Sequence, residues 1–257
     1  MRAVLTCALV SLPLLITLPA IAEEPSMFSF LSPRKPVLAT TDYNRILGAT
    51  VIDATPLAVV SPGTLNVTSG TLVACDPLAM PDMPPLTFHI PKGRYPLDLI
   101  IADDKDWGER VALAVLKVRD ETPVRYELAG TAGQDMRKLK RDEYYGFGVD
   151  AGMAALMDVE AQADYLEFIN TLIDAGKDNL YDDYFAERLA VIGNIAEHSR
   201  AEGDWLDWEV PNSGGKNVIM FASGLGDGYY PVYTGKNTQG DIVNVVVDFQ
   251  VLLQPDE

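Results

Sequence analysis

Short apolar runs separated by turn-forming residues fill the first half of the chain. The runs are rich in Val, Ile, Leu and Thr, and Pro-Gly, Ser-Gly and Lys-Gly pairs stand between them. Their spacing of about ten residues is typical of an antiparallel sheet or sandwich and not of βαβ units. The predicted strands are residues 57–60, 65–68, 71–75, 86–90, 97–102 and 110–118, with 124–128 as a further candidate.

The pattern becomes helical in the second half. Polar residues of mixed charge at 133–142 predict a surface loop. Apolar residues at helical spacing then predict an amphipathic helix over residues 161–175, and residues 181–192 predict a second helix or helical turn. The apolar stripe of the first helix consists of Leu166, Phe168, Ile169, Leu172 and Ile173.

Strand-like runs return at residues 217–222, 229–234 and 242–253, and residues 42–47 predict a helical turn near the start. The acidic stretch 197–211 is expected to be a loop. Together these patterns predict an α+β fold. It is mainly an antiparallel sheet or sandwich, with a short helical insertion in the second half.

The N-terminus has the pattern of an export signal. Arg2 supplies a positive charge, residues 3–18 are apolar, and Ala20-Ile21-Ala22 is a small-x-small cleavage site. The apolar core is short for a membrane span, and a buried N-terminal helix explains fewer of these features. We therefore expect cleavage after Ala22, a periplasmic protein without a stable membrane anchor, an N-terminal arm at residues 23–50, and a single α+β domain at residues 51–257.

The chain is strongly acidic. It has 37 acidic and 20 basic residues, a formal charge of −17, and loss of Arg2 with the signal leaves −18. Such a field argues against nucleic acid and anionic lipid as ligands and favours a basic protein partner, a cation, or simple solubility. Only Cys75 remains after cleavage, so no intramolecular disulfide forms, and its apolar neighbours predict a buried residue and not a reactive thiol.

Familiar catalytic and metal motifs are missing from the sequence. His89 and His198 are the only histidines, and no cysteine or second histidine stands at ligand spacing from either. There is no Gly-x-Ser-x-Gly nucleophile turn and no EF-hand loop. The sequence therefore predicts no metal, no cofactor and no catalytic set of the usual kinds.

Glycine-flanked aspartates are the remaining candidates. The segment 223–231 reads Ser-Gly-Leu-Gly-Asp-Gly-Tyr-Tyr-Pro, and its glycines allow positive φ angles around Asp227. The loop lacks the lysine of a phosphate-binding loop, and Asp227 would repel a phosphate. Asp150 is expected to cap a short helix at residues 151–157, which would put Asp158 about 12 Å away along the axis. Asp150 and Asp158 could not then share one ion, whereas Asp150 and Asp227 could still meet through folding.

Several short motifs are spread over the mature chain. They are Ser69-Gly70, Asp76-Pro77, Pro91-Lys92-Gly93-Arg94-Tyr95-Pro96, Arg110-Val111-Ala112, the segments 146–152 and 223–231, Met157-Asp158 and Asp248-Phe249. Together they resemble the domain-of-unknown-function 4241 family over roughly residues 70–253, and the two glycine-rich segments are long enough to be specific. The resemblance implies the fold of that family and no established reaction. A signal peptide is a departure from most of its members.

Two classes of function follow from these observations. The first is an exported, acidic, non-catalytic binding protein, for instance an immunity protein that neutralises a secreted antibacterial toxin, since acidic inhibitors associate rapidly with basic targets. The second is a carboxylate-based enzyme or a cation-dependent ligand binder that uses Asp150 and Asp227. The candidate binding residues are Asp150, Asp158, Asp227, Tyr230, Arg94, Trp205 and Trp208.

The predicted contact surface is the acidic stretch 197–209. Trp205 and Trp208 would be its aromatic anchors. The charged rim around them would consist of Glu202, Asp204, Asp207 and Glu209. The competing interpretation is a solvated acidic loop whose tryptophans pack inward.

Overall fold

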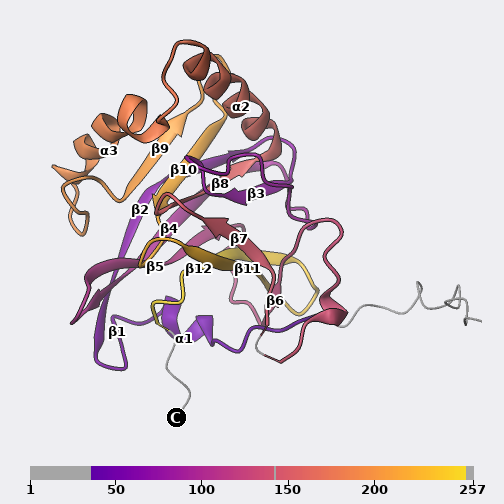
Figure 1. The fold of residues 1–257 in the computed structure, drawn as a ribbon. Helices are drawn as coiled ribbons and strands as arrows, with labels where there is room; N and C mark the ends of the chain where they lie inside the picture. The colour runs from indigo at the N-terminus through magenta and orange to yellow at the C-terminus, as the bar shows by residue number, and fades with distance from the viewer. Residues whose placement is uncertain (1–35, 142, 253–257) are drawn as a thin grey trace, which may run out of the picture. The chain divides into compact units, whose positions relative to one another are not determined.

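Two antiparallel β-sheets pack against each other in a computed structural model, which describes residues 36–141 and 143–252 (Figure 1). The predicted signal peptide lies outside the described residues. In chain order the helices and strands are α1 (Tyr43–Leu47), β1 (Val51–Ile52), β2 (Thr55–Val67), β3 (Leu72–Cys75), β4 (Gly93–Asp104), β5 (Gly108–Lys117), β6 (Arg125–Leu128), a 3-10 turn (Met136–Lys138), β7 (Gly146–Val149), β8 (Met153–Asp158), α2 (Val159–Asp174), a π-helical turn (Tyr181–Phe185), α3 (Ala186–Gly193), β9 (Trp205–Glu209), β10 (Asn217–Ala222), β11 (Gly228–Lys236) and β12 (Ile242–Asp248).

The strands form a large and a small sheet. The large sheet has the order β1-β2-β4-β5-β12-β11-β6, and β7 also pairs with β11, next to the glycine-rich loop. The small sheet has the order β3-β8-β10-β9, and every pairing in both sheets is antiparallel. The predicted class, α+β with mainly antiparallel sheet and a short helical insertion, is confirmed.

Both faces of the large sheet are buried at its centre. Leu99 and Ile101 on β4 face the core between the sheets, whereas Ile100 faces the opposite side. There α1 covers the sheet with Tyr43 and Ile46. Because strands buried on both faces need apolar residues at successive positions, the runs at 97–102 and 110–118 show little alternation.

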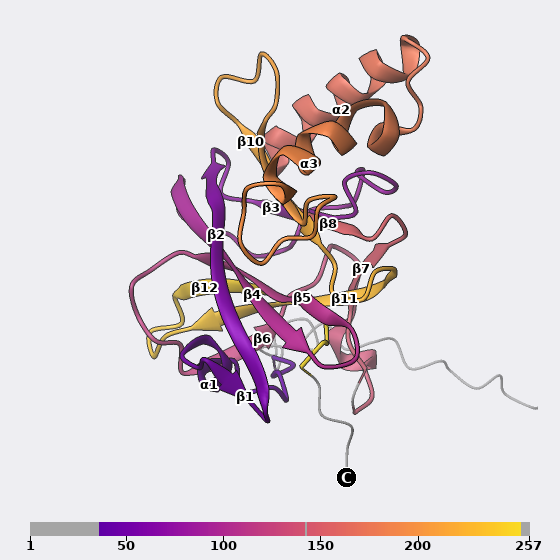
Figure 2. The ribbon, with the colours of Figure 1, turned by 90° about the vertical axis from the view of Figure 1, so that its left-hand side faces the viewer.

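The two helices α2 and α3 cover the outer face of the small sheet, as Figures 1 and 2 both show. An aromatic cluster lies between the helices and the sheet. The ring centroids of Tyr165, Phe185 and Trp208 in this cluster are 5.3–6.3 Å apart. The inner face of the small sheet meets β2, where Asn217 accepts a hydrogen bond from Asn66 N–H at 2.9 Å. Each aromatic pair among Tyr165, Phe185 and Trp208 adds about 0.5–1.5 kcal/mol beyond the area that it buries.

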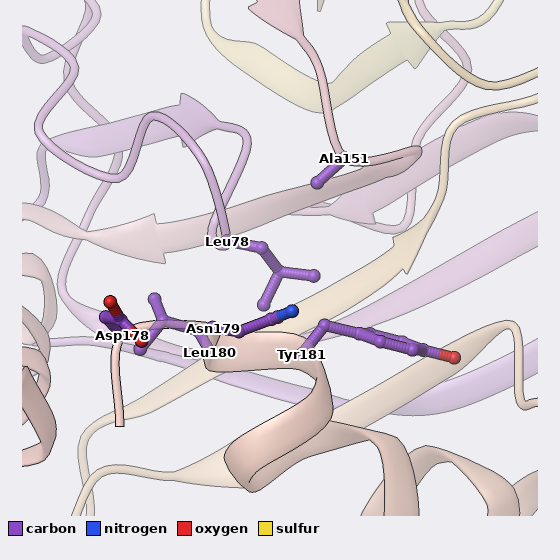
Figure 3. Close-up of a pocket in the computed structure, with 6 residues that line it drawn as sticks. All are labelled: Leu78, Ala151, Asp178, Asn179, Leu180 and Tyr181. Atoms are coloured by element: carbon purple, nitrogen blue, oxygen red, sulfur yellow. The ribbon is translucent and has the colours of Figure 1, made fainter. Parts of the chain in front are cut away.

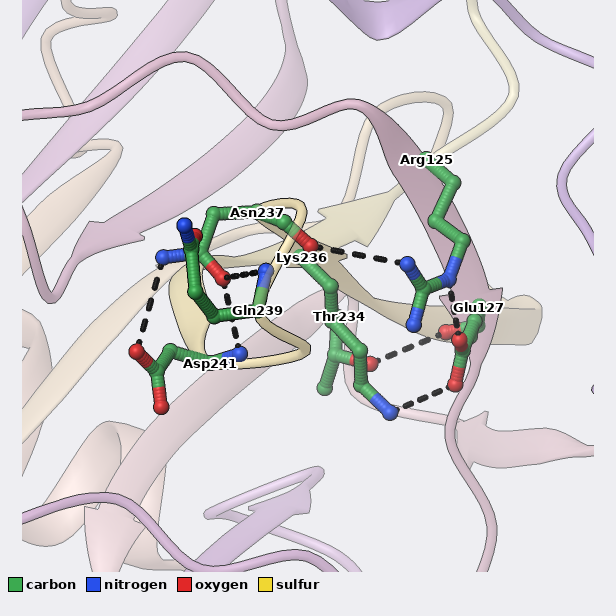
Figure 4. A network of polar contacts seen from close by, with 7 residues as sticks. All are labelled: Arg125, Glu127, Thr234, Lys236, Asn237, Gln239 and Asp241. Carbon is green, nitrogen blue, oxygen red and sulfur yellow. Dashed lines mark hydrogen bonds and ion pairs between the residues drawn. The ribbon is translucent and has the colours of Figure 1, made fainter.

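A hairpin turn connects β11 to β12 in the large sheet. Asn237 Oδ1 accepts the backbone N–H groups of Gln239 and Asp241, at 3.1 and 2.9 Å. Beside it Glu127 accepts from Arg125 Nε at 2.7 Å and from Lys236 Nζ at 2.5 Å (Figure 4). These polar contacts satisfy the groups at the sheet edge, where the chain reverses.

Three local predictions are wrong. Residues 151–157 are not a helix capped by Asp150, because 153–158 form β8, whose residues are all buried between β3 and β10. Residues 86–90 make an isolated bridge in place of a strand, and the acidic stretch expected as a loop contains β9. The compact unit of the structure begins at Pro36 and includes α1, which packs into the core.

Other local predictions hold. Asp42 caps α1 by accepting the N–H of Arg45 at 3.2 Å. The two strands predicted at 57–60 and 65–68 are one strand, β2, whose register shifts between Val60 and Gly63. Cys75 is fully buried, and burial raises the pKa of its thiol, which disfavours the reactive thiolate.

Candidate functional site

Asp76 holds together two turns that are far apart in sequence. Its carboxylate accepts the N–H groups of Leu78 and Ala79 after β3, at 2.8 and 2.9 Å. It also accepts those of Asp150 and Ala151 between β7 and β8, at 2.8 and 2.7 Å. The side chain is completely buried, and its four acceptor positions are all used. Asp76 is therefore a structural residue that fixes the backbone on which Asp150 stands.

Asp158, one of the predicted binding residues, is also committed to structure. It caps α2 by accepting the N–H of Glu160 at 2.9 Å. Its carboxylate further accepts the N–H of Ser69 at 2.9 Å, the hydroxyl of Ser69 at 2.8 Å and the N–H of Gly70 at 3.3 Å. These bonds join the start of α2 to the turn before β3.

Tyr230 supports the glycine-rich loop from below. Its buried hydroxyl donates toward the carbonyl oxygen of Gly226, at 2.7 Å, and that of Ser223, at 3.1 Å. Burial and the nearby charge of Asp227 raise the pKa of Tyr230, which keeps the hydroxyl protonated as a donor. Gly224 and Gly226 have the predicted positive φ angles, 62° and 114°. Tyr230 thus positions the loop and is not exposed to a partner.

Asp150 and Asp227 come to the same end of one strand pair. Val149 on β7 is the register partner of Gly228 on β11. Asp150 directly follows Val149, and Asp227 directly precedes Gly228, so the two aspartates leave the antiparallel pair at the same end. Both are exposed, and neither side chain makes a hydrogen bond or ion pair to another described residue. Arg94 is exposed on β4 opposite Asn66 and does not join them.

Trp205 and Trp208 lie in the core. They are 7 % and 8 % exposed on β9, and Trp208 packs on Tyr165, Phe168 and Phe185. The inward-packing interpretation of these tryptophans is therefore the one that the structure supports. Their aromatic rings do not form the exposed centre of the surface predicted at 197–209.

A cleft of about 330 Å³ opens beside the glycine-rich loop. We call it the arginine cleft. Its polar side chains are Arg110 from the start of β5, Tyr181 from the π-helical turn, and Arg200 and Glu202 from the chain after α3. The turns at 151–153 and 222–226 complete its wall.

A second hollow, of about 400 Å³, shares Ala151 and Tyr181 with the arginine cleft. Figure 3 shows Leu78 between Ala151 and the chain that carries Asn179 and Tyr181. The turn at residues 150–151, whose N–H groups bond to Asp76, thus borders both depressions. Single π-helical turns such as the one that begins at Tyr181 are frequent at functional sites.

A family model described as "Protein of unknown function (DUF4241)" matches residues 65–247. The chain belongs to this family. The comparison with curated proteins gave no match, and neither did the comparison with solved structures.

Three of the segments that resemble the DUF4241 family meet at the arginine cleft. They are the segment that begins at Arg110, the turn that ends at Gly152, and the glycine-rich loop around Gly224 and Gly226. In the sequence, Arg110 is a candidate only as part of the resemblance, and no pattern indicates Tyr181 or Arg200. The one local signal for Arg110 is that it is a charged residue near the start of an otherwise apolar strand.

Among the described residues, no group of three or more His, Cys, Asp or Glu is arranged to hold a metal ion. No helix in the same part of the chain is both long and apolar enough to span a membrane.

Proposed function

We propose that this member of the DUF4241 family is an exported, acidic, non-catalytic binding protein whose partner is a basic protein. A secreted antibacterial toxin that it neutralises, as an immunity protein does, is the partner that this chemistry fits best. The supporting observation is where the charge lies. Residues 159–210 contain 13 acidic and three basic residues, a net charge of −10 out of −17 for the whole chain.

Most of this charge is exposed on the helices that cover the small sheet. We call the exposed side chains of residues 159–197 the acidic helical face. Its exposed carboxylates are Glu160, Glu167, Asp174, Asp178, Asp182, Asp183, Glu187 and Glu197. Each belongs to α2, to α3 or to a segment next to them, so they point away from the small sheet.

Apolar side chains are exposed among these carboxylates. Val191 on α3 is 60 % exposed, and Ile195, four residues later, is 77 % exposed. An apolar centre inside a charged rim is the usual composition of a protein interface. The acidic helical face therefore replaces the stretch 197–209 as the proposed contact surface.

The first test identifies the partner and its dependence on charge. We expect the mature chain, immobilised, to capture a basic protein from a periplasmic or secreted fraction, and the purified pair to bind at low salt. Glu167→Gln, Asp174→Asn and Glu187→Gln together should weaken binding, because these exposed side chains make no hydrogen bond or ion pair to another described residue. The matched control is Asp103→Asn, Asp106→Asn and Asp120→Asn, which removes three exposed carboxylates from the large-sheet region. Equal binding by both triple variants would contradict the assignment of the surface.

Neutralisation is tested separately. If the captured protein is a toxin, its production should arrest growth, and co-production of the exported chain should restore it. If the triple variant of the acidic helical face restored growth as completely as the natural chain, neutralisation would not depend on this surface.

Export rests on the N-terminal sequence pattern. We expect N-terminal sequencing of the protein from the periplasm to begin at Glu23. Recovery of intact Met1 from the cytosol would contradict this part of the proposal.

The second candidate is a carboxylate-based enzyme or a cation-dependent ligand binder. The register that aligns Asp150 with Asp227 favours it. Two carboxylates supply only part of the six to eight oxygen ligands that Ca²⁺ takes, so any cation bound there would need ligands from the substrate or water. Titration with Ca²⁺ or Mg²⁺ tests it: saturable binding that Asp150→Asn and Asp227→Asn abolish would support this candidate.

A further inference from the structure

The arginine cleft contains hydrogen-bond donors that the described part of the chain leaves unused. Arg110 is partly buried, and its guanidinium makes one hydrogen bond, from Nη1 to the carbonyl oxygen of Glu109 at 2.7 Å. A guanidinium carries five N–H donors in a planar fork. Most of the donors of Arg110 are therefore free for a ligand.

A long-range contact brings a second arginine to the same cleft. Glu109, next to Arg110, meets His198 Nδ1 at 2.6 Å, although the two residues are 89 positions apart. Two residues beyond His198, Arg200 donates from Nε to Asp204 at 2.7 Å and from its backbone N–H to the same carboxylate at 2.7 Å. Arg200 is thus held in place, and the hydrogen bond with Asp204 raises its pKa further.

The glycine turns leave open space beside the two arginines. Gly152 and Gly226 have φ angles of 66° and 114°, and no described atom lies within 4 Å of the position that a Cβ would take at either. The N–H groups of Gly224 and Leu225 make no hydrogen bond to other described residues. Backbone donors in such left-handed turns are suited to an anion.

Acidic groups stand around these donors. Glu202 lines the cleft, and Asp150 and Asp227 each adjoin a residue of its wall. A ligand with several negative charges, such as a phosphate, is repelled by these carboxylates and by the charge of the whole chain. A single carboxylate fits the fork of Arg110 with two parallel hydrogen bonds, and a cationic group nearby complements the acidic rim.

We infer that the arginine cleft binds the carboxylate of a basic amino acid, either free or as the C-terminal residue of a peptide. Arg110 and the loop N–H groups hold the carboxylate, and Glu202 with the neighbouring aspartates faces the cation. The cleft volume lies at the lower end of the range for small-ligand sites, which suits a ligand of this size. The inference does not depend on the proposed function, because it concerns a different surface.

Calorimetric titration of the mature chain tests this site with four probes: L-lysine, L-arginine, a pentapeptide that ends in lysine as the free acid, and the same peptide as the amide. We expect saturable binding of a free amino acid or of the free-acid peptide, and which of the two binds tells the sources apart. Amidation should weaken peptide binding at least tenfold. Arg110→Gln should weaken binding of any ligand at least tenfold. Arg119→Gln, which changes an exposed arginine just after β5 and outside the cleft, should leave binding unchanged.

Two further variants keep the test independent of folding. Arg110→Lys retains the charge and loses the planar fork, so we expect weakened binding by a protein of unaltered thermal stability. Glu202→Gln should weaken lysine binding and should not weaken acetate binding. Absence of saturable binding by all the carboxylate probes, tighter binding of inorganic phosphate, equal binding of the amide, or unchanged binding by a folded Arg110→Gln variant would each overturn the inference.

Discussion

The exposed carboxylates of the acidic helical face and the buried carboxylates of Asp76 and Asp158 are used in opposite ways. On the helical face, Glu167, Asp174 and Glu187 are exposed and have no partner within residues 36–141 and 143–252. Asp76 and Asp158, in contrast, are completely buried, and between them they accept hydrogen bonds from four segments of backbone. Net charge alone therefore does not tell how much of it a partner can meet.

This difference has an energetic consequence. A buried carboxylate that accepts several N–H groups stabilises the fold, because the same groups would otherwise be buried without partners. An exposed carboxylate without a partner contributes little to folding and keeps its whole field for recognition. Substitutions in the two regions should separate stability from binding.

The largest expected effect comes from Asp76→Ala. It leaves four backbone N–H groups without an acceptor, and hydrogen bonds to a charged group are worth about 1.5–3 kcal/mol each. We expect the free energy of unfolding in urea to fall by at least about 3 kcal/mol. Asp150→Ala, a change to the exposed neighbour whose N–H bonds to Asp76, should stay within about 0.5 kcal/mol. Similar losses for both would mean that Asp76 is not the residue that fixes these turns.

Substitutions in the glycine-rich loop come next. Gly226→Val should destabilise by roughly 1–3 kcal/mol, because a β-branched residue is strained at a φ of 114°. Gly228 does not have a positive φ angle, but a Cβ there would come within 2.7 Å of the Tyr230 ring. Gly228→Val should therefore also lower the melting temperature, by displacing Tyr230. Asp227→Asn should not lower it, since its side chain is exposed. A loss as large as that of Gly226→Val would make Asp227 a structural turn residue.

Asp248 offers a smaller, pH-dependent effect. Burial raises its pKa, against hydrogen bonds donated by the Tyr43 hydroxyl at 2.7 Å and the Gln250 N–H at 2.7 Å. A raised folded pKa means that the folded protein binds the proton more tightly than the unfolded chain. The stability of the natural chain relative to Asp248→Asn should therefore decrease as pH rises from about 3.8 through the raised pKa, and then level off. Urea unfolding of both proteins across this range checks the sign.

Glu127 should show the opposite sign. Burial raises its pKa, but hydrogen bonds from Lys236 and Arg125 outweigh that effect, so the pKa of Glu127 is lowered. The stability that Glu127 contributes relative to Glu127→Gln is present above its ordinary pKa of 4.5 and is lost as pH falls through the lowered one. Parallel pH dependence of the Asp248 and Glu127 differences would contradict this pair of assignments.

The sequence predicted most of the strands, because Ser-Gly and Lys-Gly pairs mark the end of β2 and the start of β4, whereas the Pro-Gly pair lies inside β2 at its register shift. It predicted the segment 151–157 wrongly, since a short apolar run is ambiguous between helix and strand until its neighbours are known. Here the neighbours are β3 and β10, which come from distant parts of the chain. β9 was missed because the acidic residues in and around it are typical of a loop.

The candidate site was predictable only where local sequence determines it. The positive φ angles of Gly224 and Gly226 follow from the glycine-rich composition of the loop. The sequence allowed Asp150 and Asp227 to lie close together, but it did not determine that they do. The arginine cleft depends on the contact of Glu109 with His198 across 89 positions, for which no local pattern exists. Trp205 and Trp208 show the reverse: their residue types fit a binding surface, but both are buried, and Trp208 packs on aromatic side chains of α2 and the π-helical turn.

The most direct test of recognition by the acidic helical face is the salt dependence of association with the purified basic partner. Screening shortens the field to about 8 Å at physiological ionic strength, so long-range attraction fades while short contacts persist. We expect the association rate of the natural chain to fall steeply between low and physiological salt, with a smaller change in dissociation. The triple variant Glu167→Gln, Asp174→Asn, Glu187→Gln should lose much of that salt dependence, and the large-sheet triple variant should retain it. Identical salt dependence in all three proteins would contradict the account.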